Sequence, residues 1–309
     1  MRGEISYNKD GKGGDFIYRL IAIDIDGTLI NRNMQLTAPT RQAIAKAMEQ
    51  GIHVTLATGR SFHSAKKYAD RLKLDVPLIC ANGGMIRHRD GSIMSETNFD
   101  NKIIAPLLAE MQAEDLYFQV YHRDGIIANV KRTSLTSWVQ MICENKLKPA
   151  NLAYSVREFF QSRVRKDPGM IQAVVEGRLD SHKVFAIGKL GSLEKIFENA
   201  TRRGLSADYY LGYKNHMYLE IAPPGISKGW ALQKLARHLE LDMEQVVAIG
   251  DNLNDRTMIQ AAGLGIVMGN GPSQLKKLAG RVTLSNDQDG VAAAFNSIIL
   301  PASDSQRAV

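Results

Sequence analysis

Two aspartates directly follow the first strongly apolar segment of the chain. Residues 20–29 read Leu-Ile-Ala-Ile-Asp-Ile-Asp-Gly-Thr-Leu, so Asp24 and Asp26 end an isoleucine-rich run that breaks at Gly27. Such a run is typical of a strand buried on both faces of a parallel sheet. Two carboxylates there repel each other and resist desolvation unless a cation lies between them. The pattern therefore indicates a cation site at a strand end; the alternative is a helix-capping aspartate and an ordinary turn.

A second apolar segment ends in a hydroxyl, a glycine and a cation. Residues 53–60 read His-Val-Thr-Leu-Ala-Thr-Gly-Arg, and a helix is expected to begin near Ser61. The Thr58 hydroxyl and the N–H group of Gly59 can bind an anion at that point. The alternative is that Thr58 or Ser61 only caps the helix.

A lysine stands in the first turn of another predicted helix. Residues 226–230 read Ile-Ser-Lys-Gly-Trp, and the apolar face that follows consists of Leu232, Leu235, Ala236 and Leu239. Lys228 opposes the helix dipole there, since an acid is preferred in the first turn. This placement indicates that Lys228 faces an anion; a solvated surface lysine is the alternative.

A fourth segment repeats the architecture of the first. Residues 245–255 read Gln-Val-Val-Ala-Ile-Gly-Asp-Asn-Leu-Asn-Asp, an apolar strand that runs into acids. Asp251 comes to lie beside Asp24 if the two strands are neighbours. Several carboxylates at one point imply a hard divalent cation, and oxygen ligands without nearby His or Cys favour Mg²⁺ over zinc.

These four segments, in this order, resemble the four motifs of the haloacid dehalogenase-like phosphohydrolases. The long insert between the second and third motifs resembles the α/β cap of the Cof-type branch. The resemblance extends from Tyr18 to about Leu300 and includes the Cys-Ala-Asn-Gly-Gly turn of residues 80–84. The departures from the family pattern are small: Gly84 stands where alanine is common, and Arg256 where an apolar residue is usual.

The resemblance implies an α/β fold, in which a Rossmann-like parallel-sheet core carries an inserted α/β cap domain that sets substrate specificity. The expected organisation is a disordered tail (1–18), a core domain (19–85 and 223–300), the cap (86–222) and a C-terminal tail (301–309).

The implied activity is Mg²⁺-dependent hydrolysis of small phosphate monoesters, such as a sugar phosphate or a related metabolite, through an aspartyl-phosphate. Asp24 is the expected nucleophile, and Asp26 the general acid and base. The metal ligands implied are Asp24, the backbone carbonyl of Asp26, and Asp251. The phosphate-binding groups implied are the N–H groups of Ile25 and Gly59, and the side chains of Thr58, Lys228 and Asn254. Supporting residues are Asp255, expected to orient Lys228 or a metal-bound water, and Asn82.

Composition agrees with a cytoplasmic enzyme. A chain of 309 residues with 44% hydrophobic content buries a large core, and its length suggests two domains. Its two cysteines, Cys80 and Cys143, form no disulfide framework, which favours a reducing compartment. The polar residues before Tyr18 lack the apolar region of a signal peptide, and no stretch reaches the ~18 apolar residues of a membrane span.

The net charge of +7 favours anionic ligands. Nucleic acid is one such ligand, but the basic residues are scattered without interleaved aromatic residues. We therefore expect a small phosphorylated metabolite as the partner, with neither nucleic acid nor membrane, and a monomer or homodimer.

Strand and helix patterns alternate along the chain, which is typical of βαβ units. In the expected core they are strands 20–25, 52–57 and 78–81 and helices 39–50 and 61–72. In the insert they are a hairpin (118–122 and 125–130, turning at Asp124-Gly125), helices 135–146, 156–166 and 193–203, and strands 183–187 and 217–221. Residues 223–225, Pro-Pro-Gly, end the insert as a stiff linker.

Other classes share parts of this pattern. A response-regulator receiver is a single short domain, and a P-type ATPase needs membrane spans. A phosphomutase of the same fold differs only in delivering the phosphate to a second hydroxyl. A non-enzymatic sugar-phosphate sensor is expected to lose Asp24, Asp26 or Asp251, all of which are present.

The leaving group is not encoded in the four motifs. Relatives in the Cof-type branch act on hexose and pentose phosphates, pyridoxal phosphate or a phosphorylated ribitylaminouracil. Side chains of the insert that could reach a substrate, or could instead only pack or face solvent, are His122, Arg123, Lys183, Tyr213, Lys214, His216 and Tyr218.

Overall fold

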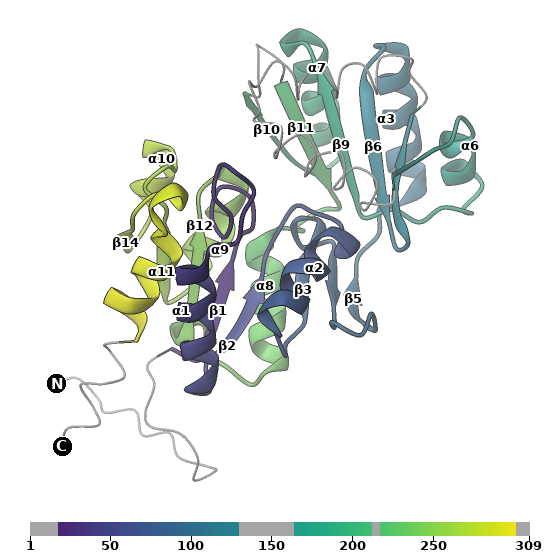
Figure 1. Cartoon of the computed structure of the whole chain (residues 1–309). Helices are drawn as coiled ribbons and strands as arrows, with labels where there is room; N and C mark the ends of the chain where they lie inside the picture. The colour runs from purple at the N-terminus through teal and green to yellow at the C-terminus, as the bar shows by residue number, and fades with distance from the viewer. Residues whose placement is uncertain (1–17, 130–163, 212–216, 301–309) are drawn as a thin grey trace, which may run out of the picture. The chain divides into compact units, whose positions relative to one another are not determined.

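The computed structural model describes residues 18–129, 164–211 and 217–300 (Figure 1). The chain divides into two compact units, one of Met1–Thr55 with Ala236–Val309 and one of Leu56–Leu235. The predicted tails at 1–18 and 301–309 fall outside the described residues, apart from Tyr18. The predicted helix at 135–146 also lies outside them.

The first unit is built on a five-stranded sheet with the order β14-β13-β12-β1-β2. Its strands are β1 (Leu20–Ile23), β2 (His53–Leu56), β12 (Val246–Gly250), β13 (Leu264–Val267) and β14 (Arg281–Val282). The pairs β1–β12, β12–β13 and β13–β14 are parallel. Every residue of β1 and β12 is buried, as the unbroken apolar runs predict. The α/β prediction is confirmed.

The register of β1 and β12 fixes the position of the acids. Ile23 pairs with Ile249, and the Asp24 N–H donates to the Ile249 carbonyl at 2.9 Å. Figure 1 shows the two strands side by side. Asp24 and Asp251 therefore leave the same edge of the sheet from adjacent strands, as the sequence predicts.

Helices complete the first unit. They are α1 (Ala38–Glu49), α9 (Arg256–Ala261), α10 (Ser273–Lys276) and α11 (Gly290–Ala294), with α8 (Lys228–His238) crossing the boundary between the units. The hydroxyl of Thr37 accepts the Thr40 N–H at the start of α1, and Pro39 suits the first turn. This helix buries Ala43, Ile44 and Ala47, the apolar face that its sequence predicts.

The second unit contains two sheets and helix α2 (Phe62–Leu72). One is an antiparallel sheet of β3 (Leu78–Cys80), β4 (Met85–Arg87) and β5 (Ile93–Glu96). Ala57, just beyond β2, forms an isolated parallel bridge with Ile79 of β3. The predicted third core strand thus pairs mainly with the antiparallel strands that follow it.

The other sheet of this unit has six strands in the order β10-β11-β9-β6-β7-β8. They are β6 (Tyr117–His122), β7 (Gly125–Ala128), β8 (Val164–Lys166), β9 (Lys183–Gly188), β10 (Ser206–Leu211) and β11 (Met217–Ala222). The helices of this part are α3 (Asn101–Ala113), α6 (Met170–Val175) and α7 (Leu190–Arg202), and α3 and α7 lie against the sheet (Figure 1).

Alternation along the strands of the six-stranded sheet separates two faces. Val120, Val184 and Leu219 point into the apolar core shared with α3, α6 and α7. Lys183 and Glu220 follow the opposite alternation, and both are nevertheless buried.

The predicted hairpin is confirmed as the antiparallel pair of β6 and β7, which turns between His122 and Gly125. The predicted helix at 156–166 is wrong over its described end, because Val164–Lys166 forms β8 and pairs in parallel with β7. Pairing to an existing strand outweighs the weak local helix preference there. The strands β4, β5 and β10 and the helices α3 and α6 had no counterpart in the sequence-based assignment.

Candidate active site

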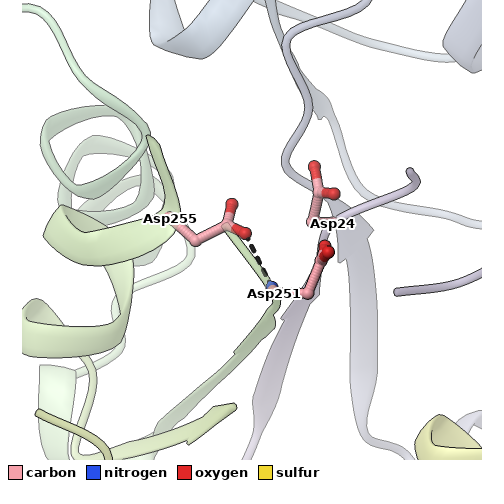
Figure 2. Close-up of side chains that lie close together, drawn as sticks. All are labelled: Asp24, Asp251 and Asp255. Carbon is pink, nitrogen blue, oxygen red and sulfur yellow. Dashed lines mark hydrogen bonds between the residues drawn. The ribbon is translucent and has the colours of Figure 1, made fainter. Parts of the chain in front are cut away.

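Three carboxylates gather at the edge of the first unit's sheet. Asp24 follows β1, Asp251 follows β12, and Asp255 ends the short turn (Leu253–Asp255) before α9. One carboxylate oxygen from each lies within 4.8 Å of the others. Figure 2 shows the Asp24 and Asp251 side chains close together, with Asp255 beside them. Because Asp24 and Asp255 are buried and Asp251 is half-buried, this oxygen-only cluster suits a hard divalent cation.

Asp251 is held from two sides. The Thr28 hydroxyl donates to Asp251 Oδ1 at 2.9 Å, and Asn270 Nδ2 donates to Oδ2 at 3.2 Å. Asn270 Nδ2 also donates to the carbonyl of Gly27 at 2.9 Å. The carboxylate is therefore oriented by Thr28 from the loop after β1 and by Asn270 from the loop after β13. The four motifs alone did not indicate these two contacts.

Asp255 is fully buried, and its carboxylate bonds to the backbone of its own loop. Its Oδ2 accepts the N–H groups of Asp251 at 2.9 Å and Asn252 at 3.0 Å; Figure 2 marks the first of these bonds. The carboxylate thus shapes the turn that carries Asp251. Its predicted role, orienting Lys228 or a metal-bound water, stays a prediction.

The remaining predicted residues of this unit lie in the same two loops. The chain turns tightly after β1: the Leu29 N–H donates to the Asp24 carbonyl, and the Ile30 N–H to the Ile25 carbonyl. This turn leaves the Asp26 side chain exposed while Ile25 is buried. Asn254 lies half-buried in the turn that ends at Asp255.

Thr58 lies in the second unit, two residues beyond β2, and is 1% exposed. Its hydroxyl accepts the Arg60 N–H at 3.2 Å, before α2 has begun. Ser61 is the N-cap residue of α2, and its hydroxyl makes no capping bond. The helix-capping alternative for these two hydroxyls is therefore wrong, and the Thr58 hydroxyl hydrogen remains available as a donor.

Lys228 begins α8 and is 1% exposed, so the solvated-surface alternative is wrong. A buried ammonium needs anions or acceptors around it. Its positive charge contributes to a low pKa at Glu220. Burial alone raises the pKa of Glu220, but the charge and hydrogen bond of Lys183, the bond from Asn82 and the charge of Lys228 together bring it below the ordinary value.

Asn82 lies in the turn Ala81–Gly83, with a left-handed backbone at φ 55° that asparagine tolerates well. Its Nδ2 donates to Glu220 Oε2 at 2.7 Å. The predicted supporting residue is thereby joined to an acid from β11 that sequence reasoning did not single out.

The side chains proposed for substrate contact have varied surroundings. Lys183 is 2% exposed and pairs with Glu220, and Arg123 pairs with Glu96 at 2.7 Å. The Tyr218 ring lies 5.6 Å from that of Phe185, centroid to centroid. His122 is buried. Three further candidates, Tyr213, Lys214 and His216, lie outside the described residues.

A family model described as haloacid dehalogenase-like hydrolase matches residues 21–295, which include all four motifs. The chain belongs to this family. The predicted fold class, a haloacid dehalogenase-like α/β fold, and the predicted hydrolase are therefore confirmed.

Relatives within the haloacid dehalogenase-like family match nearly the whole chain. The phosphatase YwpJ of Bacillus subtilis is 28% identical, with 91% of this chain and 100% of that protein covered. The 5-amino-6-(5-phospho-D-ribitylamino)uracil phosphatase YwtE of the same organism is 30% identical over 91% of this chain and 98% of its own. A solved haloacid dehalogenase-like hydrolase from B. subtilis has a TM-score of 0.79 at 27% identity, covering 91% and 99% of the two chains.

In the described part of the chain, no helix combines the length and the apolar character needed to cross a membrane.

Proposed function

We propose that the protein is a Mg²⁺-dependent phosphatase of small phosphate monoesters that works through an aspartyl-phosphate on Asp24. The observation that carries the proposal is the acidic cluster of Asp24, Asp251 and Asp255, in which Asp24 and Asp251 directly follow adjacent parallel strands. Asp24 and Asp251, with the backbone carbonyl of Asp26, would hold the ion, and such oxygen ligands match the preference of Mg²⁺. When bound, the ion neutralises the charge that otherwise repels an anionic nucleophile from a phosphate.

Asp24 and Asp26, in the loop after β1, take the two chemical roles of the reaction. A carboxylate oxygen of Asp24 attacks phosphorus while the bond to the ester oxygen breaks, and the Asp26 carboxyl gives its proton to that oxygen. The Asp26 carboxylate then takes a proton from water, which attacks the phosphorus and releases inorganic phosphate and free Asp24. The exposure of Asp26 beside the buried Asp24 agrees with a group that exchanges protons with incoming water.

The equatorial phosphoryl oxygens need donors. We assign this role to the Thr58 hydroxyl, the Lys228 ammonium, the N–H groups of Ile25 and Gly59, and the Asn254 side chain. The burial of Thr58 and Lys228 supports the assignment, because donors held in a dry site need no reorganisation during the reaction. Removing one such donor typically lowers the rate by ~10²–10³.

The substrate proposed is a small phosphorylated metabolite, such as a sugar phosphate or a related compound. One relative is named for a substrate that joins a phosphorylated ribityl chain to a uracil ring, which belongs to this class. We propose that residues 86–222 form the cap that selects among these esters. A cytoplasmic location is proposed from the cysteine content and composition, and a monomeric or dimeric state stays an expectation.

A panel of phosphate esters, assayed for free phosphate with and without Mg²⁺, tests the function. We expect Mg²⁺-dependent release of phosphate from p-nitrophenyl phosphate and from a subset of the metabolites. The Asp24→Asn variant is the matched control for contaminating phosphatase. No release from any ester would contradict the proposal, and isomerised sugar phosphate in place of free phosphate would replace the hydrolase by a mutase.

A further inference from the structure

A buried ion pair connects two strands of the six-stranded sheet. Lys183 of β9 and Glu220 of β11 lie 2.5 Å apart, and their side chains are 2% and 9% exposed. The free energy needed to desolvate two charges can exceed the electrostatic energy gained by pairing them. A buried ion pair is therefore weak evidence for a purely stabilising role. Its further hydrogen bonds indicate another role, because Lys183 also contacts the loop of Thr58 and Gly59, which the proposed function uses, and Glu220 contacts Asn82, which is bonded to that loop.

Lys183 acts on the loop of Thr58. Its Nζ donates to the Gly59 carbonyl at 3.0 Å. That carbonyl belongs to the peptide group whose N–H, on Arg60, donates to Thr58 Oγ1 at 3.2 Å. The ammonium thus polarises a peptide that bonds the hydroxyl, and hydrogen bonds in series strengthen one another. Because the Thr58 hydroxyl oxygen accepts the Arg60 N–H, the hydroxyl can donate its own hydrogen to another acceptor.

Glu220 acts on the same residue by another route. Its Oε2 accepts Asn82 Nδ2 at 2.7 Å, and the Asn82 N–H donates to the Thr58 carbonyl at 3.0 Å. The two routes from the ion pair therefore end at two different polar groups of Thr58, its hydroxyl and its carbonyl.

There is little space around this arrangement. A β-carbon on Gly59 would lie 3.0 Å from Asn82 Oδ1, 3.0 Å from Lys183 Nζ and 3.4 Å from Glu220 Oε1. The three polar side chains are thus packed around the α-carbon of Gly59, where a larger residue would push against them.

We infer that Lys183 and Glu220 are positioning residues, which hold the Thr58 hydroxyl in the orientation that donates to a phosphoryl oxygen. The inference rests on the proposed function, in which Thr58 binds phosphate. It gives Lys183 a different role from the direct substrate contact that its position in the insert suggested.

A double-mutant cycle tests the inference, with kcat and KM for p-nitrophenyl phosphate as readouts. The paired change Lys183→Met with Glu220→Gln removes both charges, so that neither is left buried alone. It is made in the native chain and in the Thr58→Val variant, which has no hydroxyl. We expect kcat/KM to fall about 10²-fold in the native chain, the loss of one donor, and to fall no further with Thr58→Val.

An equal loss in both backgrounds would overturn the inference, because the pair would then act independently of Thr58. The control is Arg203→Met with Glu110→Gln, which removes another 2.5 Å pair in the same unit, half-buried, between the C-cap residue of α7 and α3. We expect it to leave kcat/KM unchanged. If the paired variant fails to fold, Glu220→Gln alone, which preserves size, runs the same cycle.

Binding of inorganic phosphate, measured by calorimetry with Mg²⁺ present, separates this inference from the proposed function. The paired change should weaken phosphate binding about tenfold, and only where Thr58 is present. This cycle needs no turnover, so a chain that hydrolyses no ester would contradict the proposed function while still testing the role of Lys183 and Glu220. Equal weakening with and without the Thr58 hydroxyl would again overturn the inference.

Discussion

The carboxylate of Asp251 lies so close to the α-carbon of Gly27 that no methyl group fits between them. A β-carbon built on Gly27 would lie 2.2 Å from Asp251 Oδ2, and the backbone at Gly27 has a φ of 77°. The glycine that follows the two aspartates of the first motif is therefore required by an aspartate more than two hundred residues away. It leaves the space in which Asp251 meets Asp24.

We predict that Gly27→Ala impairs activity beyond its effect on stability. The added methyl group must displace the Asp251 carboxylate, and the positive φ adds strain of about 1 kcal/mol or more. The Mg²⁺ concentration at half-maximal activity should rise at least tenfold. Gly51→Ala is the matched control, because Gly51 also has a positive φ of 87° but nothing within 4 Å of its β-carbon. Equal metal titrations for the two variants would show that strain alone, rather than the displaced carboxylate, accounts for the effect.

Asp24→Asn is expected to abolish Mg²⁺-dependent hydrolysis of p-nitrophenyl phosphate and to preserve the fold, since an amide is not a competent nucleophile. The near-isosteric change avoids the cavity that alanine would leave. Initial rates and circular dichroism spectra check the two parts of the prediction. A rate close to that of the native chain would remove Asp24 from the mechanism.

Asp251→Ala should raise the Mg²⁺ requirement by about two orders of magnitude, while thermal unfolding changes little. The ion would lose an anchor supplied by a separate strand, and water would replace it only in part. Metal titrations of activity measure the effect. Superimposable curves for variant and native chain would show that Asp251 is not a ligand.

Glu96 is expected to make the stability of the second unit depend on pH. His182, whose Nδ1 lies 3.5 Å from Glu96 Oε1, and Arg123, which donates at 2.7 Å, lower the pKa of Glu96 to about 2 against the opposing effect of burial. A lowered pKa means that the ionised carboxylate stabilises the fold fully above the ordinary value of 4.5, and that this contribution disappears as the pH falls toward 2.

Glu96→Gln should therefore lower the free energy of unfolding by about 2 kcal/mol at pH 7, with the difference shrinking as the pH falls below 4.5. Urea titrations between pH 7 and pH 3 measure it. Glu198→Gln is the control, because its pair with Arg202 lies on the exposed surface of α7 and contributes within about 0.5 kcal/mol. A pH-independent difference for Glu96→Gln would contradict the assigned cause.

The sequence by itself determined the chemistry of the acidic site. Two apolar runs that end in aspartates are buried parallel strands, and the carboxyl ends of such strands meet at one edge of a sheet. The proximity of Asp24 and Asp251 followed from that rule, as did the α/β fold of the first unit. The order of the motifs indicated the family, because it places two aspartates, a hydroxyl, a lysine and a second group of acids in a fixed succession.

Only the tertiary structure decided which groups hold these residues in place. Lys183 is 124 residues from Gly59 and 37 from Glu220, and their meeting depends on strands that pair out of chain order. An alternating strand pattern shows which residues share a face, but it does not reveal whether a lysine on that face is solvated or buried. The same limit explains Gly27, which reads as an ordinary turn glycine until Asp251 is brought against it. Local patterns specify local structure, whereas contacts between distant segments are decided when the whole chain packs.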